Sequence, residues 1–159
     1  MNLVIRSASP DDAAVVHRFI RALAEYEREP DAVEATPESL RAQMLAARPP
    51  FECLLAERDG EPIGFALFFQ NYSTWRGRPG IYLEDLFVLP EQRGLGAGLA
   101  LLKRTAAIAV ERGAVRMEWV VLDWNKPAID FYDSVGAKPL DAWTVYRLAD
   151  DALRRFAGS

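Results

Sequence analysis

The sequence predicts a mixed α/β fold in which helices cover both faces of a central sheet. Three observations lead to this prediction. Apolar residues recur at helical spacing near the N-terminus, strand-like segments dominate from Phe51, and a glycine-rich turn then opens a long helix. The expected order of elements is β-α-α-β-β-β-α-β-α-β. The 159 residues contain no repeat and no linker, so we expect one domain over residues 1–159.

The N-terminal part of the chain is expected to hold one strand and two helices. Residues 2–7 read as the strand, and Ser9 followed by Pro10 is typical of a helix start. The second helix is shorter and is expected to run from Thr36 to about Ala47. The apolar stripe of the first helix is expected to contain Val16, Phe19, Ile20 and Leu23.

The pattern changes to strands from Phe51. Residues 51–57 and 62–69 read as two strands around a turn at Asp59-Gly60, and a loop over 71–80 follows. The later elements are expected to be a strand (81–88), a helix (99–112), a strand (115–122), a helix from Asn125 to Gly136 and a last strand (143–148).

Composition and charge exclude several classes of protein. The formal charge of −4 and the pI near 5.1 argue against a protein that binds nucleic acid through its overall field. One cysteine, Cys53, and one histidine, His17, allow neither an intramolecular disulfide nor a structural zinc site, and no metal is expected. No apolar run approaches the ~20 residues that cross a bilayer. The N-terminus also lacks the apolar core of a signal peptide, so we expect a cytoplasmic protein without a membrane partner.

The strongest local signal is the run RGLGAG (93–98), between a predicted strand and a predicted helix. Glycines let the backbone approach a bulky anion, and a helix N-terminus offers free N–H groups. A P-loop would need Lys-Ser/Thr after the last glycine, and a dinucleotide fingerprint would need G-x-G-x-x-G. This run fits neither, so an anion site of another kind is predicted. A glycine-rich helix start without a ligand is the alternative.

Two motifs resemble the GNAT superfamily of N-acetyltransferases. LEDLFVLPEQRGLGAGLALL (83–102) resembles its acetyl-CoA motif, R/Q-x-x-G-x-G/A. VVLDWNKPAIDFYDSVGAKPL (120–140) resembles its N-x-x-A-x-x-F-Y-x-x-x-G-A element. A narrower resemblance is to the diamine (spermidine/spermine) and thialysine acetyltransferases. It is carried by the N-terminal segment, the run IYLEDLFV and the tryptophan in DWN, and it covers the chain from about residue 3 to about residue 148.

The resemblance implies acetyl-CoA as cosubstrate. It implies that Leu86, Phe87 and Val88 offer a backbone donor to the acetyl carbonyl. Asn125 matches a position that contacts the pantetheine arm, although Asn125 could equally be only a helix N-cap. The remaining cofactor-binding residues that the resemblance implies are Arg93, Gly94, Leu95, Gly96, Ala97, Gly98, Leu99 and Ala128.

Acetyl transfer to an amine needs a proton acceptor, because a free alkylamine has a pKa near 10.4. Glu84 and Asp85 are consecutive on a predicted strand and are expected on opposite faces, so only one can enter a given cleft. The resemblance assigns Glu84 as the base or a substrate-binding carboxylate, and pairing with a neighbouring cation is the alternative. Tyr132 matches the residue that protonates the departing thiolate; the alternative is a core tyrosine.

Tyr26, Glu27 and Trp143 match acceptor-binding positions of the diamine subgroup, and Trp75 is a candidate wall of the same site. The acidic run from Glu25 to Glu34 would attract a cation, although a solvated loop is the alternative. We therefore expect direct acetyl transfer to a small primary amine, either a diamine or polyamine or a thialysine-like amino acid.

Two alternative functions stay open. One is acetylation of another amine, such as an amino acid, an amino-sugar drug or a protein N-terminus. The other is a non-catalytic domain that senses acyl-CoA. The resemblance also implies a homodimer, for which the strand WTVYRL (143–148) and the FALFF face (65–69) offer apolar surface.

Overall fold

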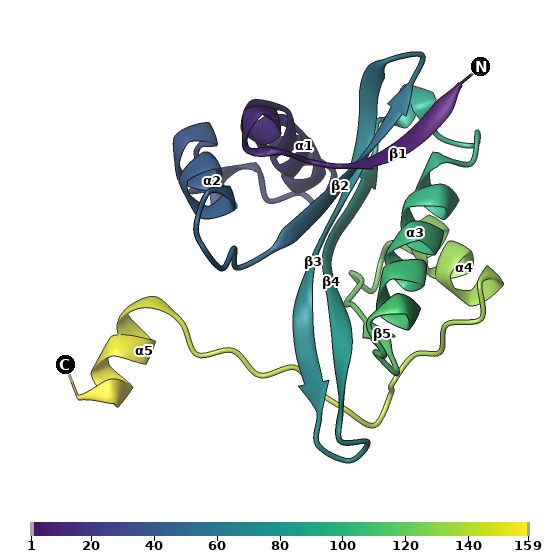
Figure 1. The fold of residues 1–159 in the computed structure, drawn as a ribbon. Coiled ribbons are helices and arrows are strands. Elements are labelled where there is room, and N and C mark those ends of the chain that lie inside the picture. The colour runs from purple at the N-terminus through teal and green to yellow at the C-terminus, as the bar shows by residue number, and fades with distance from the viewer. Residues whose placement is uncertain (1, 159) are drawn as a thin grey trace. The chain divides into compact units, whose positions relative to one another are not determined.

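The computed structural model describes residues 2–158, and the chain divides into two compact units, 1–120 and 121–159. The first unit holds a five-stranded sheet with the strand order β1-β2-β3-β4-β5 (Figure 1). The neighbouring pairs from β1 to β4 are antiparallel, whereas β4 and β5 are parallel. The predicted mixed sheet is therefore confirmed, and the single domain expected over residues 1–159 stays a prediction.

All five strands of the sheet belong to the first unit, and Figure 1 labels each of them. Their bounds are β1 (Leu3–Ser7), β2 (Glu52–Arg58), β3 (Glu61–Ser73), β4 (Arg78–Val88) and β5 (Met117–Glu118).

Helices cover both faces of this sheet, as predicted. The helices α1 (Ala13–Tyr26) and α2 (Pro37–Met44) lie on one face, and α3 (Ala97–Glu111) lies on the other (Figure 1). Single-turn 3-10 helices, η1 (Pro10–Asp12), η2 (Pro30–Ala32) and η3 (Pro90–Gln92), precede or follow them.

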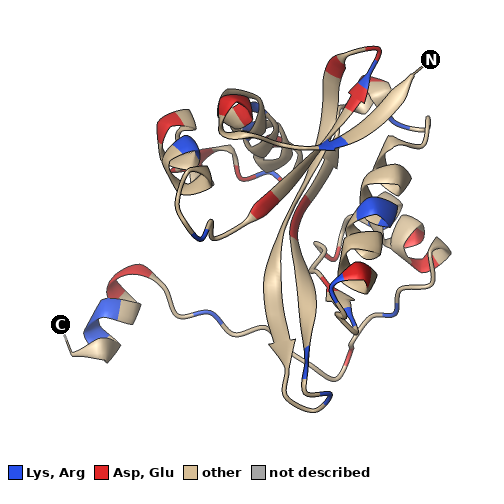
Figure 2. Cartoon of the chain, viewed as in Figure 1, with Lys and Arg blue, Asp and Glu red and all other residues tan. Residues whose placement is uncertain are grey.

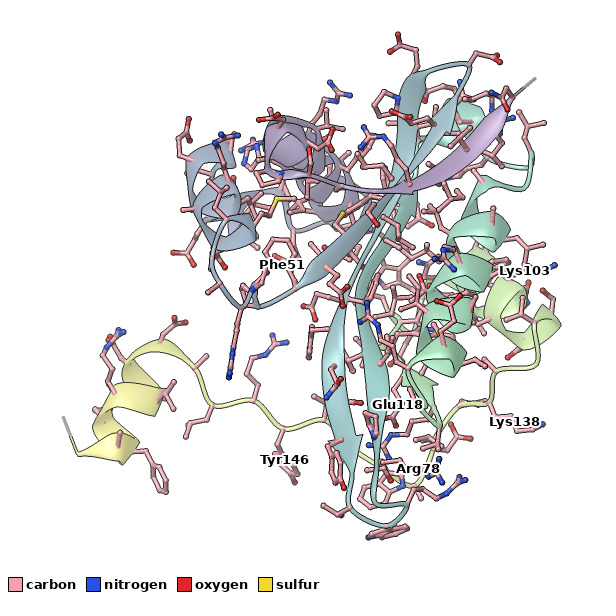
Figure 3. The ribbon with its side chains drawn as sticks, viewed as in Figure 1. Phe51, Arg78, Lys103, Glu118, Lys138 and Tyr146 are labelled. Atoms are coloured by element: carbon pink, nitrogen blue, oxygen red, sulfur yellow. The ribbon has the colours of Figure 1, made fainter. Side chains whose placement is uncertain are left out.

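The main core lies between α1 and the sheet. Val16 and Phe19, two members of the predicted stripe, are completely buried, and the Phe19 ring stacks on Phe65 of β3 with centroids 5.8 Å apart. On the opposite face, α3 buries Leu101 and Thr105, while Lys103 points away from the sheet on its outer side (Figure 3). Burial of these apolar surfaces supplies the main stabilisation of both layers.

Local caps position the first two helices. Thr36 Oγ1 accepts a hydrogen bond from the Ser39 amide, and Ser39 Oγ accepts one from the Thr36 amide, both at 3.0 Å. Arg6 of β1 binds Asp12 at the start of α1 at 2.8 Å and Glu57 of β2 at 3.1 Å. This pairing lowers the pKa of Asp12 to about 2 and joins β1, β2 and α1.

The prediction of a loop over 71–80 is wrong, because β3 and β4 continue as a long two-stranded ribbon with a tip at residues 74–77. Figure 2 shows basic residues at this tip, and Arg78 lies there in Figure 3. Polar residues and glycine suggest a loop by composition. A ribbon that extends from the sheet tolerates them, because its tip and Tyr72 are exposed, while Ser73 and Gly80 are buried.

Two other strand predictions need correction. The strand expected over 115–122 is reduced to Met117–Glu118, because β4 and β5 pair only at Ile81 and Tyr82. The strand expected over 143–148 is absent: this described segment pairs with no other described strand, and the helix α5 (Asp150–Ala157) follows it. Alternating apolar residues form a strand only where a neighbouring strand is available to hydrogen bond with them.

The second unit contains α4 (Lys126–Ser134), the extended segment 143–148 and α5. Tyr146 lies on the extended segment in Figure 3 and is 95% exposed. The expected apolar face of FALFF (65–69) is not a free surface, since residues 65–68 are buried within the first unit. Within residues 2–158, no helix is both long enough and apolar enough to span a bilayer.

Candidate acceptor and cofactor site

One extra residue in β4 determines where the acidic side chains lie. Leu67 of β3 pairs with Asp85, and the next residue, Phe68, pairs with Leu83, so Glu84 is inserted as a β-bulge. A bulge interrupts the alternation of side chains between the two faces of a sheet. The expectation that Glu84 and Asp85 lie on opposite faces was based on regular alternation, and the bulge overturns it.

The face that carries Asp85 is the one covered by α1. Directly paired residues of antiparallel strands share a face, and Leu67, the partner of Asp85, belongs to the core packed against α1. Glu27 immediately follows α1. Glu27, Glu84 and Asp85 lie close enough for each carboxylate to repel the other two, and Figure 2 shows the acidic segment midway along β4.

Burial and repulsion by neighbouring carboxylates both disfavour the ionised forms of Glu27 and Asp85. Desolvation is the larger cause of the rise in the pKa of Asp85 to about 7, and repulsion by Glu84 and Glu27 adds to it. The pKa of Glu27 is also raised, first by desolvation and then by Glu84. A cation placed among these carboxylates would lower the pKa of both Asp85 and Glu27, so the cluster is suited to bind a positively charged group.

Asp85 is the site residue that the sequence analysis missed. Its position beside Glu84 was noted, but regular alternation placed it on the other face. The acidic pair in the otherwise apolar run IYLEDLFV marks both residues as unusual, but the bulge itself is visible only in the pairing of β4 with β3.

Arg93 connects the predicted acceptor residues with the glycine turn. Its Nε donates a hydrogen bond to the Val88 carbonyl at 2.8 Å. Its guanidinium carbon lies 4.9 Å from the centroid of the Tyr26 ring and 5.4 Å from that of Phe87. Arg93 therefore joins the end of α1, the end of β4 and the start of the turn by one hydrogen bond and two cation–π contacts.

The glycine turn leads directly into α3. Gly94 and Gly96 have φ angles of +79° and +90°, which favour glycine, and no side chain caps the N-terminus of α3. Its first N–H groups therefore have neither a cap nor an intrahelical acceptor. A Cβ at Gly98 would meet only Val88 Cγ2, at an ordinary 3.8 Å, so packing alone does not require glycine there. A ligand that approaches the backbone closely would require it.

The end of β4 offers a second row of backbone groups. The pairing with β5 ends at Tyr82, so Leu86, Phe87 and Val88 have a strand partner only on the β3 side within the described chain. The predicted backbone donor to an acetyl carbonyl belongs to this stretch, and the turn at 93–98 follows it.

The predicted residues of the second unit form a local helix start. Asn125 Oδ1 accepts a hydrogen bond from the Ala128 amide at 3.4 Å, which is the N-cap role considered above. Tyr132 lies on α4 with its ring centroid 5.6 Å from that of Phe131. Trp143 is 69% exposed on the segment that precedes α5.

Trp75, the candidate wall of the acceptor site, lies away from the acidic cluster. Trp75 is 86% exposed at the tip of the β3–β4 ribbon, nine residues before Glu84. Its distance along the strand separates it from the carboxylates of its own chain. Among residues 2–158, no group of three or more His, Cys, Asp or Glu side chains is arranged to hold a metal ion.

Comparisons with known proteins agree with the motifs. Residues 16–137 match the family described as "Acetyltransferase (GNAT) family". The thialysine N-epsilon-acetyltransferase of Bos taurus is 41% identical over 98% of this chain and 98% of its own length. The L-ornithine N5-acetyltransferase of Arabidopsis thaliana is 30% identical over 94% of this chain and 86% of its own length.

The fold also matches solved structures. An integron cassette protein from the mobile metagenome of V. cholerae superimposes with a TM-score of 0.83 and covers 100% of this chain and 99% of its own. At 24% sequence identity this similarity is evidence of a shared fold alone.

The raised pKa of Asp85 predicts a pH dependence of stability. Between about pH 4 and pH 7 the folded chain keeps the Asp85 proton, whereas the unfolded chain has lost it. The free energy of unfolding should therefore fall as the pH rises through this range and level off above it. Urea unfolding at several pH values measures this slope. Asp85→Asn should flatten the slope, while Asp31→Asn on the exposed η2 turn should not; equal slopes for Asp85→Asn and the parent chain would contradict the assignment.

Proposed function

Because the chain belongs to the acetyltransferase (GNAT) family and is an N-acetyltransferase, we propose that it transfers the acetyl group of acetyl-CoA to a primary amine of a small diamine, polyamine or thialysine-like amino acid. The observation that carries the proposal is the cluster of Glu27, Glu84 and Asp85 on the α1 face of the sheet. The relatives named above act on thialysine and ornithine, which both carry two amino groups.

Selectivity for a second positive charge follows from electrostatics. Three carboxylates that repel one another are stabilised by a cation more than a single exposed carboxylate would be. One carboxylate can then serve the reacting amine while the others hold a distant ammonium group. A monoamine would leave part of the cluster uncompensated, so the second amine should improve binding.

The proposed reaction proceeds by direct transfer. Glu84 takes a proton from the ammonium form of the acceptor, and the neutral nitrogen then attacks the acyl carbon of the thioester. Backbone N–H groups of the stretch from Leu86 to Val88 stabilise the carbonyl oxygen as charge develops on it. The C–S bond breaks, and the thiolate accepts a proton from Tyr132. The nitrogen loses its second proton to solvent to give the amide, solvent returns a proton to the Tyr132 oxygen, and Glu84 releases its proton to solvent.

Cys53 supports direct transfer over an acyl-enzyme. It is the only cysteine in the sequence, and burial, followed by repulsion from Asp85, raises the pKa of its thiol to about 12. The thiolate is the nucleophilic form of cysteine, so this side chain is a poor acyl carrier.

The cosubstrate is proposed to bind by its phosphates at the turn and by its pantetheine arm along β4. The uncapped N–H groups of residues 97–99 suit phosphate oxygens, and glycines 94 and 96 add no side chain of their own to the turn. Asn125 and Ala128 are proposed to contact the pantetheine arm, as the motif implies. Arg93 is proposed to hold the turn through its contacts rather than to bind phosphate.

A homodimer in the cytoplasm is the proposed working form. Apolar side chains on 143–148 and α5 are exposed, including Val145 at 73%, Tyr146 at 95% and Phe156 at 83%. Apolar side chains that gather on a surface are typical of an interaction site. The acceptor roles proposed for Tyr26 and Trp143 follow the subgroup motif.

Glu27→Gln tests the acceptor assignment. The substitution keeps the shape of the side chain and removes one charge, so the KM for a diamine should rise by about tenfold, whereas the KM for a monoamine of equal length should change little. Steady-state kinetics with both amines measures this difference. Glu29→Gln, in the same acidic run but exposed, is the matched control and should affect neither KM. Equal effects of Glu27→Gln on the two amines would remove the case for a diamine acceptor.

Tyr132→Phe tests the proton donor. The hydroxyl is lost while the ring stays, so kcat should fall by about a hundredfold with little change in Tm or in the dissociation constant for CoA. Tyr146→Phe provides the control, because its exposed hydroxyl lies on the segment before α5. An unchanged kcat, under conditions where chemistry limits the rate, would leave Tyr132 with a packing role only.

Sedimentation equilibrium tests the assembly. The expected mass at micromolar concentrations is near twice 17.8 kDa. Phe156→Ser should shift the distribution toward monomer, whereas the parent chain should stay dimeric. A monomeric parent chain over the whole concentration range would contradict the dimer.

A further inference from the structure

Arg58 is a buried arginine at the end of β2. Only 9% of the residue is exposed, and it pairs by backbone with Leu3 of β1 and Glu61 of β3. An arginine this deeply buried is normally paired with a carboxylate, because an unpaired charge loses its hydration without compensation.

Within the described chain, the guanidinium of Arg58 has no carboxylate partner and one hydrogen bond. Its Nε donates to Gln92 Oε1 at 3.2 Å, and its buried Nη2 has no hydrogen-bond partner. The adjacent acids have other partners: Glu57 binds Arg6 at 3.1 Å, and Asp59 accepts a hydrogen bond from the Asn2 amide at 2.9 Å. The positive charge of Arg58 is therefore not neutralised by these neighbours.

The hydrogen bond to Gln92 connects Arg58 with the glycine turn. Gln92 is the last residue of η3, and the glycine turn begins with the next residues, Arg93 and Gly94. The guanidinium is thus hydrogen bonded to the residue that directly precedes the turn opening α3. This turn is flanked by two sources of positive potential, Arg58 through Gln92 before it and the uncapped N-terminus of α3 after it.

We propose that Arg58 is a positioning residue for the cosubstrate: it holds the turn through Gln92, and its unneutralised charge strengthens the binding of the phosphate groups of acetyl-CoA. The inference rests on the proposed use of acetyl-CoA. Because Nη2 is buried, Arg58 acts through Gln92 and through its field rather than by touching the ligand. The free-energy cost of burying the Arg58 charge is then offset when the phosphates bind, because opposite charges attract strongly where water is excluded.

The test compares two acetyl donors, acetyl-CoA and S-acetylpantetheine, which lacks the phosphates. In Arg58→Met, which has a side chain of similar reach and no charge, the KM for acetyl-CoA should rise by about tenfold with kcat unchanged. The KM for S-acetylpantetheine should stay at the parent value. Arg58→Lys, which keeps the charge, should recover much of the affinity for acetyl-CoA.

Gln92→Glu provides a second variant that leaves Arg58 in place. A carboxylate against the guanidinium would keep the contact and neutralise the charge, so it should also weaken acetyl-CoA selectively. This variant decides the question even where Arg58→Met fails to fold. Equal changes for the two donors in either folded variant, or no change in either, would overturn the role of Arg58. A parent chain that uses neither donor would instead contradict the proposed function.

Discussion

The extra residue at position 84 of β4 is the structural constraint on which the candidate site depends. Without this bulge, regular alternation would separate the carboxylates of Glu84 and Asp85 by the thickness of the sheet. With it, both lie near Glu27 on the face that α1 covers, and the charge of Glu84 raises the cost of ionising Glu27 and Asp85. A cation would offset this repulsion, and the proposed diamine acceptor would offset more of it than a monoamine would.

The same strand changes its environment along its length. At Ile81 and Tyr82, β4 is paired with both β3 and β5, and beyond Tyr82 only β3 remains as its partner in the described sheet. The end of β4 thus has one edge paired with β3 and one edge without a strand partner in the described sheet, where the proposed ligand would bind. Arg93 keeps this end in place, because it holds the Val88 carbonyl and packs on the rings of Tyr26 and Phe87. Arg93 thereby links the turn to Tyr26, the residue that precedes Glu27.

The parts of the fold that depend on local pattern could be predicted. The buried stripe of α1 and the glycine turn before α3 follow from spacing and from backbone conformation, and both are confirmed. Asp85 could not be placed, because a bulge is a property of two paired strands and the sequence of one strand does not contain its register. The strands expected over 115–122 and 143–148 are wrong for the same reason: strand propensity does not say whether a neighbouring strand is available to pair with the segment.

The rate of CoA thiol release from acetyl-CoA, measured for the parent chain over a panel of amines, tests the central claim most directly. The panel would contain diamines, ornithine, thialysine and monoamines of equal length. We predict measurable turnover, with a kcat/KM for acceptors with two amino groups at least tenfold above that of the matched monoamines, of the order of one charge-assisted hydrogen bond. Binding of acetyl-CoA without thiol release for any amine, or equal kcat/KM values for matched diamines and monoamines, would contradict it.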